Sequence, residues 1–282
     1  MRFFTVLALI IFIIFLSGCV NENKVNGNIL IQSSYTRVKN NVKIYVDVTN
    51  TLKNEIRDVD VSFDSLSILE LVGIENCENK KDFGCKIERM EPGEKKRISF
   101  SFKIPETISD WREISLNPIL SVSYDYSDET LLTIPILGKD LIDEKNNYKL
   151  YESDGPLKVV MSLPSKNSKG NEMKSVYGGD WFVLEVKILN TGGNIVEIKK
   201  NNFFVEFSPN TFSAYKGDDS YCDFETSGNH LELKEDVVIY NEKSFLCTLL
   251  AKNIENTRAW ETGSIKARYS YRYKVMEEIE IS

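Results

Sequence analysis

The feature that most constrains the fold is a two-residue alternation of apolar and polar side chains, which recurs along most of the chain. From Ile98 to Ile104 apolar residues alternate with serines and a lysine, and Tyr269, Tyr271 and Tyr273 share one phase of a later run. Successive side chains of a β-strand point to opposite faces, so each run predicts a strand with one buried face. No long stretch after position 19 shows helical periodicity. The alternation therefore predicts an all-β protein built from antiparallel sandwiches.

The same patterns occur twice, in the same order. An alternating strand that ends in Asn-Thr lies at Val42–Thr51 and again at Trp181–Thr191, and each is followed by a strand that ends in Phe. Each half then closes with Tyr-x-Tyr, a predicted hairpin connection and Ile-x-Ile. We therefore predict an internal repeat of two tandem sandwiches, at residues 27–137 and 155–282, with the charged residues 138–154 as a linker.

The Asn-Thr elements also carry a resemblance to known domains. The runs Val46–Thr51 and Val186–Gly192 resemble immunoglobulin-like modules of bacterial and archaeal envelope proteins, including the CARDB-like adhesion-related domains. The turn Pro92–Glu94, which precedes an alternating strand, fits a further element of those modules, whereas the second half has Ile239–Lys243 in its place. The resemblance implies immunoglobulin-like sandwiches and an extracytoplasmic setting. It implies no catalytic residues, because a fold does not determine a function.

The N-terminus resembles the signal of prokaryotic lipoproteins. A short basic start precedes the apolar run Phe3–Leu16, and Leu16–Cys19 resembles a lipobox. The resemblance implies that residues 1–18 are a removable signal peptide, that Cys19 takes the lipid, and that residues 19–26 form a tether. The apolar run is shorter than the ~20 residues that span a bilayer, and an uncleaved N-terminal helix is the alternative. Both interpretations place the remaining chain on the extracytoplasmic face of the cell membrane.

The chain has five cysteines, so four remain once Cys19 is assigned to the lipid. If each half folds as a unit, Cys77 pairs with Cys85 and Cys222 pairs with Cys247. An extracytoplasmic compartment favours such bridges, which typically stabilise a fold by roughly 2–4 kcal/mol each. Four free thiols and a shared Cys₄ metal site are the alternatives, although no pair has the C-x₂₋₄-C spacing typical of zinc sites.

Composition and motifs argue against catalysis and against nucleic-acid binding. The formal net charge is −7, whereas nucleic-acid proteins usually carry a basic patch. The single histidine, His230, falls in a predicted loop and leaves no basis for a histidine metal centre. Ser213–Lys216 has the spacing S-x-x-K but lacks the partner motifs of the penicillin-binding family. We therefore expect no enzyme, no cofactor and no metal.

Two acidic clusters and the tyrosine stripes are the remaining candidates for binding. The clusters are predicted to lie in hairpin loops, and they comprise Asp125, Asp128 and Glu129, and Asp218, Asp219 and Asp223. Oxygen-rich loops bind calcium in many surface modules, but neither cluster has a recognised calcium spacing, so solvated loops are the simpler interpretation. The tyrosines would suit sugar stacking, but a core-facing stripe in a sandwich strand is the simpler explanation.

The sequence as a whole predicts a membrane-anchored extracytoplasmic lipoprotein with a non-catalytic, structural or protein-interaction role at the cell envelope. Its expected partners are the membrane, through the N-terminal lipid or helix, and an envelope protein, with no nucleic acid. The alternative is a surface module that binds a glycan, a peptide or calcium through loops at one end of a sandwich.

Overall fold

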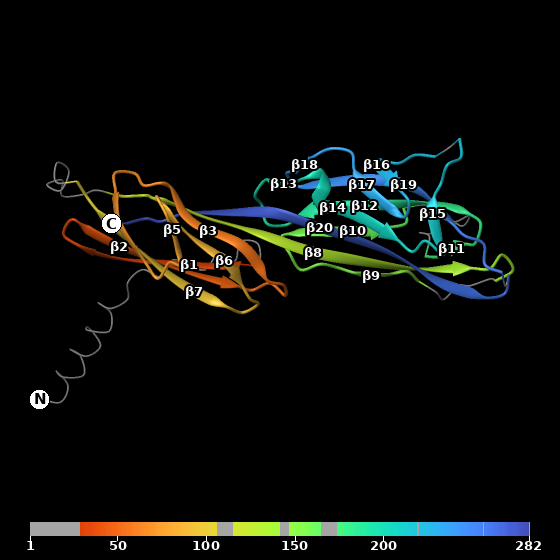
Figure 1. Ribbon diagram of the computed structural model, residues 1–282, viewed down its shortest axis with the longest axis horizontal. Helices are drawn as coiled ribbons and strands as arrows, with labels where there is room; N and C mark the ends of the chain where they lie inside the picture. Colours follow the sequence, from red (N-terminus) through yellow and green to blue (C-terminus); the bar gives the residue numbers. More distant parts are fainter. Residues whose placement is uncertain are drawn as a thin grey trace, which may run out of the picture. The chain divides into compact units, whose positions relative to one another are not determined.

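The computed structural model consists almost entirely of β-strands (Figure 1) and describes residues 29–105, 115–141, 147–164, 174–218, 220–255 and 257–281. This confirms the predicted all-β class with antiparallel sheets. The chain divides into two compact units, which are Met1–Tyr124 with Lys274–Ser282 (unit 1) and Asp125–Tyr273 (unit 2). Across the described ranges, no helix has the length and apolar character needed to cross a bilayer.

Unit 1 is a two-sheet sandwich. Its first sheet has the order β1-β2-β7-β4, with β1 (Ile29–Val38), β2 (Asn41–Asn50), β7 (Lys95–Lys103) and β4 (Glu70–Glu75). Its second sheet contains β5 (Asn79–Lys81), β6 (Gly84–Met90), β3 (Ile56–Ser65) and the unit-1 parts of β8 (Ile119–Leu137) and β20 (Trp260–Glu278). The alternating apolar residues of both sheets, such as Ile44, Val61 and Phe100, are buried between them.

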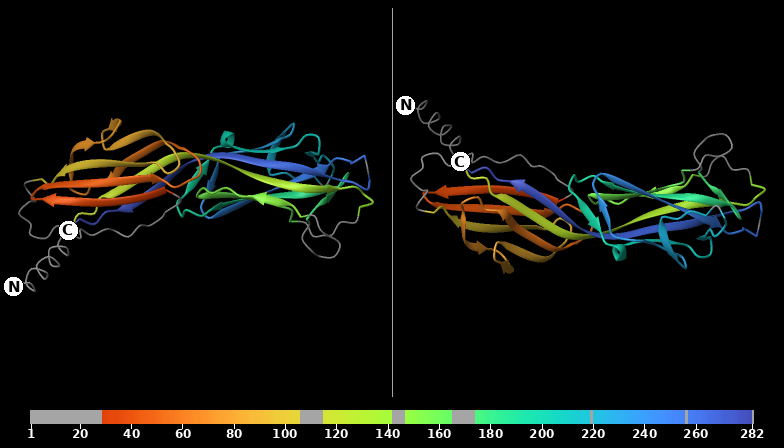
Figure 2. Two further views of the ribbon diagram at one scale, coloured as in Figure 1. Left: turned by 90° about the horizontal axis from the view of Figure 1, so that it is seen from below. Right: turned by 90° about the horizontal axis from the view of Figure 1, so that it is seen from above.

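Unit 2 repeats the order of the first sheet as β10-β12-β19-β15, with β10 (Leu157–Ser162), β12 (Trp181–Asn190), β19 (Glu242–Ala251) and β15 (Phe212–Ala214). Its second sheet has β16 (Phe224–Ser227), β17 (His230–Leu233), β14 (Phe203–Phe207), β20 and β8, with β9 (Lys149–Tyr151) and β11 (Val176–Tyr177) also paired to β8. A two-stranded sheet of β13 (Val196–Ile198) and β18 (Val237–Ile239) and the 3₁₀ turn Lys200–Asn202 complete it. The strands of this unit are visible from two sides in Figure 2.

The two predicted hairpins at the ends of the halves are wrong. Strands β8 and β20 each run without a turn for 19 residues. The charged residues that suggested a turn in β8 instead pair across strands: Asp125 accepts from Arg272 at 2.8 Å, and Glu129 lies 3.2 Å from the Lys266 ammonium. A run of charged residues can therefore continue a β-strand when its side chains form ion pairs with residues of the neighbouring strand.

The unit boundaries also differ from the predicted domain bounds. The chain passes from one unit to the other inside β8, after Tyr124, and again inside β20, after Tyr273. The end of the predicted first domain, up to residue 137, and the predicted linker 138–154 therefore fall in unit 2. In that linker, β9 pairs with Leu131–Thr133 of β8.

The repeated Asn-Thr motif has the same structural role in both units. Asn50 donates from Nδ2 to the carbonyl oxygens of Asn54 and Met90, both at 3.0 Å. Asn190 donates to the carbonyl of Tyr240 at 3.0 Å and to the carbonyl four positions further along the chain. In each case the side-chain oxygen accepts from the backbone N–H two positions onward. This asparagine clamp ties the end of a strand to the loop after it and to the opposite turn.

Candidate functional site

Both predicted disulfides are confirmed. Cys77, in the connection before β5, is bonded to Cys85 of β6 within unit 1. Cys222, just before β16, is bonded to Cys247 of β19 within unit 2. These bonds exclude the alternatives of four free thiols and a shared Cys₄ site. The predicted lipidation site, Cys19, lies with the signal 1–18 and the tether 19–26 outside the described residues, and it stays a prediction.

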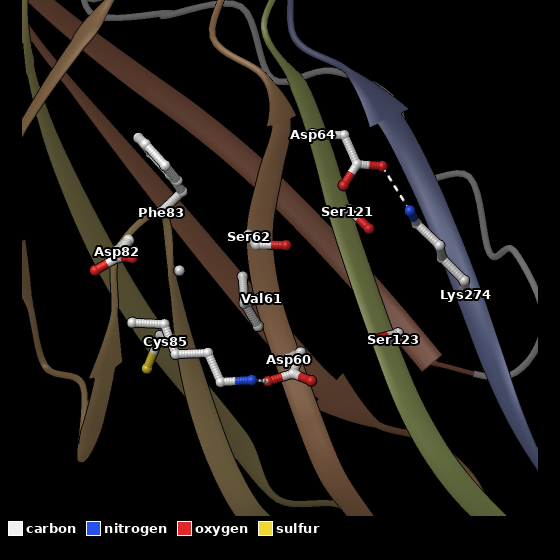
Figure 3. Close-up of a pocket in the computed structure, with 12 residues that line it drawn as sticks. Asp60, Val61, Ser62, Asp64, Asp82, Phe83, Cys85, Ser121, Ser123 and Lys274 are labelled. Carbon is white, nitrogen blue, oxygen red and sulfur yellow. Dashed lines mark hydrogen bonds and ion pairs between the residues drawn. The ribbon is translucent and has the colours of Figure 1, made fainter.

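A polar hollow lies on the outer face of the second sheet of unit 1 (Figure 3), with a volume of about 370 Å³. Its floor comes from small outward-pointing residues on three strands, Ser62, Gly84, Ser121 and Ser123. A methyl group at Gly84 would lie 2.8 Å from Cβ of Ser62, so any side chain at this position would clash with the neighbouring strand β3. We call this hollow the serine trough, because serines and a glycine form its floor. Larger side chains at these positions would fill the hollow.

Two ion pairs border the serine trough. Lys81 pairs with Asp60, and the Lys274 ammonium lies 2.6 Å from an oxygen of Asp64 (Figure 3). Asp60 and Asp64 stand on β3 on either side of Ser62, in the same outward phase of the strand. Exposed pairs of this kind contribute only about 0–1 kcal/mol to stability. Their main consequence is therefore that charged groups lie around the hollow, and their contribution to the stability of the fold is small.

The rim of the trough is the turn between β5 and β6, made of Asp82 and Phe83. The Phe83 side chain is 57% exposed, and Asp82 has no ion pair or hydrogen bond with any described residue. The Cys77–Cys85 bond holds the base of this turn, and the Phe83 carbonyl accepts from the backbone N–H of Phe63 at 3.3 Å. An aromatic side chain is thus presented to solvent on a doubly fastened turn.

Ser121 is the buried polar residue of the trough floor. It is only 3% exposed, and among the described residues no group hydrogen-bonds its hydroxyl. In Figure 3 it lies on β8 between Asp64 of β3 and Lys274 of β20. The Ser121 hydroxyl is not among the fully buried polar atoms, so it reaches the open side of the trough. An oxygen or nitrogen atom that enters the trough from outside would satisfy it.

The sequence did not predict the serine trough. Its outward serines could be read along each strand, but β3, β6 and β8 become neighbours only through long-range pairing. The only local signal was an unusual density of small polar residues in the outward phase, at Ser62 on β3 and at Ser121 and Ser123 on β8.

The first acidic cluster lies within β8 and not in a hairpin loop. Asp128 accepts from the backbone N–H groups of Glu129 at 2.8 Å and Asp154 at 3.3 Å, and Tyr126 donates to Asp154 at 2.7 Å. Burial raises the pKa of the Asp128 carboxyl, and it also raises the pKa of the Tyr126 hydroxyl. The cluster fastens the segment before β10 to the sheet.

The remaining sequence candidates are dispersed. Asp223 accepts from the backbone N–H of Leu246 at 2.7 Å, Asp218 is exposed, and Asp219 lies outside the described residues. His230 is the first residue of β17, directly after a two-residue turn, so the predicted loop is a hairpin and the histidine is in a strand. Ser213–Lys216 begins on the edge strand β15. Of the residues that the structure describes, no three His, Cys, Asp or Glu side chains are grouped to hold a metal ion.

The tyrosine stripes face the core, as the simpler interpretation predicted. Tyr269 and Tyr271 are each 3% exposed and Tyr273 is fully buried. The ring of Tyr271 meets that of Tyr126 edge to face, with centroids 6.0 Å apart. These residues fill the interior of unit 2 and are not available for stacking on a sugar.

Comparison with known proteins gives little further information. No protein-family model matches the chain, and no curated protein matches it. Among solved structures, the chain is similar to red sea bream transglutaminase, with 8% identity, coverage of 89% of this chain and 29% of that chain, and a TM-score of 0.20. It is also similar to a copper-containing benzylamine oxidase from Hansenula polymorpha, with 9% identity, coverage of 86% and 39%, and a TM-score of 0.10. The chain spans less than a third of the transglutaminase, and scores this low carry no argument.

Proposed function

We propose that this protein is a lipid-anchored extracytoplasmic protein with a non-catalytic role, in which its β-sandwich surfaces contact another component of the cell envelope. The observation that carries the proposal is that each unit contains its own disulfide. Disulfides form and persist mainly in oxidising, extracytoplasmic compartments. The lipobox-like sequence at Leu16–Cys19 supports the same location and supplies the anchor.

The chemistry of the serine trough supports a binding role. Its groups are hydroxyls and ion-paired carboxylates, which recognise a ligand by hydrogen bonding. A lipid chain gains about 0.8 kcal/mol per buried CH₂, and two chains give stable anchoring. Anchored in this way, the protein holds its binding surfaces next to the membrane.

The anchor is tested with the variant Cys19→Ser in the full chain. Wild type should fractionate with membranes, carry the mass of a lipid and be digested by protease added to intact cells or spheroplasts. Cys19→Ser should lose the lipid mass and leave the membrane. Ser17→Ala keeps a small residue before the cysteine and serves as the matched control, which should behave as wild type. A Cys19→Ser protein with unchanged mobility that stays in the membrane contradicts lipidation, and protection of wild type from protease contradicts the location.

The contact role is tested by cross-linking intact cells and capturing the tagged protein. Wild type should recover a defined envelope component in repeated preparations, and Cys19→Ser should recover less of it, because the protein is no longer held at the membrane. Recovery of no specific component from cross-linked cells contradicts the contact role.

A further inference from the structure

We infer that the serine trough of unit 1 is a binding site for a neutral saccharide. The inference names a ligand for the contact role proposed above and rests on that role for the ligand's source, an extracytoplasmic glycan. It places the site on a sheet face and not on the loops at the end of a sandwich.

The Ser121 hydroxyl favours a ligand that carries hydroxyl groups. The residue is only 3% exposed, no described residue hydrogen-bonds its hydroxyl, and it lines the open hollow. A hydroxyl donates one hydrogen bond and accepts others, so its natural partner is a group that does the same. A ligand hydroxyl lowered onto the floor of the trough meets this requirement.

The charge pattern around the floor favours an uncharged ligand. Asp60 and Asp64 each face a lysine, so acceptor and donor groups stand in pairs on both sides of Ser62. Because each carboxylate is paired with an ammonium group, the charges offset one another, and neither a free anion nor a free cation gains a net attraction from these two pairs. Uncharged hydroxyls suit both kinds of group, because each can donate to a carboxylate and accept from an ammonium.

The exposed aromatic side chain at the rim favours a saccharide. The apolar C–H face of a pyranose ring packs well against an aromatic ring, and Phe83 offers such a ring at 57% exposure. The disulfide to Cys85 and the hydrogen bond from Phe63 hold the turn in place. A preorganised aromatic group loses little freedom on binding, which favours affinity.

The size of the trough fits the same ligand. About 370 Å³ lies at the small end of the range of roughly 300–1,000 Å³ that is usual for ligand sites. The trough lies on the outer face of the sheet, so a short saccharide or one unit of a longer glycan can enter it from the side.

The test uses the full-length protein in a detergent without sugar headgroups. Maltose, cellobiose, mannobiose and chitobiose are titrated by calorimetry and by saturation-transfer NMR, with inorganic phosphate and calcium chloride as separate arms. At least one disaccharide should bind, and Phe83→Ser and Ser121→Val should each weaken that binding by about tenfold. Asp82→Asn, an exposed change that does not disturb the core, should weaken it by a few-fold.

Two matched controls exclude general effects on the fold. Ser101→Val makes the same change on the outward phase of β7, in the other sheet of unit 1, and Tyr240→Ser removes an aromatic side chain of 65% exposure in unit 2. Both should bind as wild type. If Ser121→Val fails to fold, Phe83→Ser and Asp82→Asn, both on the exposed turn, still decide the question.

The inference is overturned if no disaccharide binds at millimolar concentration, if binding is unchanged in the trough variants, or if phosphate or calcium binds there instead. Saccharide binding by the unlipidated Cys19→Ser protein is measured in parallel. Saccharide binding by a wild-type protein that carries no lipid and leaves the membrane would support the site and contradict the proposed anchor, whereas a lipid-anchored wild type that binds no saccharide would contradict the site alone.

Discussion

Units 1 and 2 share a four-stranded sheet order and an asparagine clamp, yet they place their disulfides differently. Cys77 and Cys85 are 8 positions apart and fasten a surface turn next to the serine trough. Cys222 and Cys247 are 25 positions apart and tie the start of β16, in one sheet, to β19, in the other. We infer that the shared elements specify the fold, whereas each disulfide has a separate structural role. The Cys77–Cys85 bond fixes a surface turn, and the Cys222–Cys247 bond joins two sheets.

The largest expected effect separates the two disulfides. Loop-closure entropy predicts a loss of about 3.5 kcal/mol for Cys222→Ser with Cys247→Ser, and of about 2.5 kcal/mol for Cys77→Ser with Cys85→Ser. Urea unfolding followed by hydrogen exchange, read separately for each unit, measures both. A larger loss from the unit-1 pair would contradict this order, because the bond at the surface turn would then contribute more to stability than the bond between the two sheets.

Replacing the clamp asparagines should cause the next largest losses in the free energy of unfolding. Asn50 is fully buried, so Asn50→Ala leaves buried carbonyl and N–H groups unpaired and should cost about 3 kcal/mol. Asn190 is half-buried, and water can replace part of its bonding, so Asn190→Ala should cost about 1.5 kcal/mol. Equal losses in the urea unfolding of the two variants would show that burial does not set the difference.

Acidification should change the stability contribution of one aspartate in each unit, and the two changes should have opposite signs. In unit 1, hydrogen bonds from Arg97 at 2.7 Å hold the pKa of Asp47 below its usual value, so its stabilising contribution is present at neutral pH and is lost as pH falls through that lowered pKa. In unit 2, burial raises the pKa of Asp128 above 3.8, so the folded state takes up its proton first. Its contribution is largest below 3.8 and is lost as pH rises through the raised pKa.

Unfolding free energies measured from neutral pH down to about pH 3 test this pair of effects. Asp47→Asn should destabilise by about 1 kcal/mol at neutral pH and flatten the loss of stability in acid. Asp128→Asn should remove the gain in stability on mild acidification. The same sign of pH dependence at both positions would contradict the assignment.

The smallest effect is expected on either side of the unit boundary in β20. Lys274→Ala removes an exposed ion pair with Asp64 in unit 1, and Arg272→Ala removes one with Asp125 in unit 2. Each should change the free energy of unfolding by less than about 1 kcal/mol. A much larger loss at Lys274 would show that the trough ion pair is structural and would weaken its role in binding.

The sequence revealed the strands and the cysteine pairing because both depend on local pattern and on the repeat. Alternation identified the buried faces, and the matched halves left one pairing within each half. The sequence failed where charges have cross-strand partners: Asp125 and Glu129 looked like turn residues and are part of β8. It also missed the serine trough, because Ser62 and Ser121 lie far apart in the chain and meet only through the order of the sheet.

The most direct test of the central claim, a lipid-anchored and disulfide-bonded extracytoplasmic protein, is the intact mass of the chain isolated from membranes and alkylated in denaturant without reductant. We predict a chain that begins at Cys19, carries lipid and takes up no alkyl group at the other four cysteines. A chain that begins at Met1 without lipid, or one alkylated at Cys77, Cys85, Cys222 and Cys247, would contradict it.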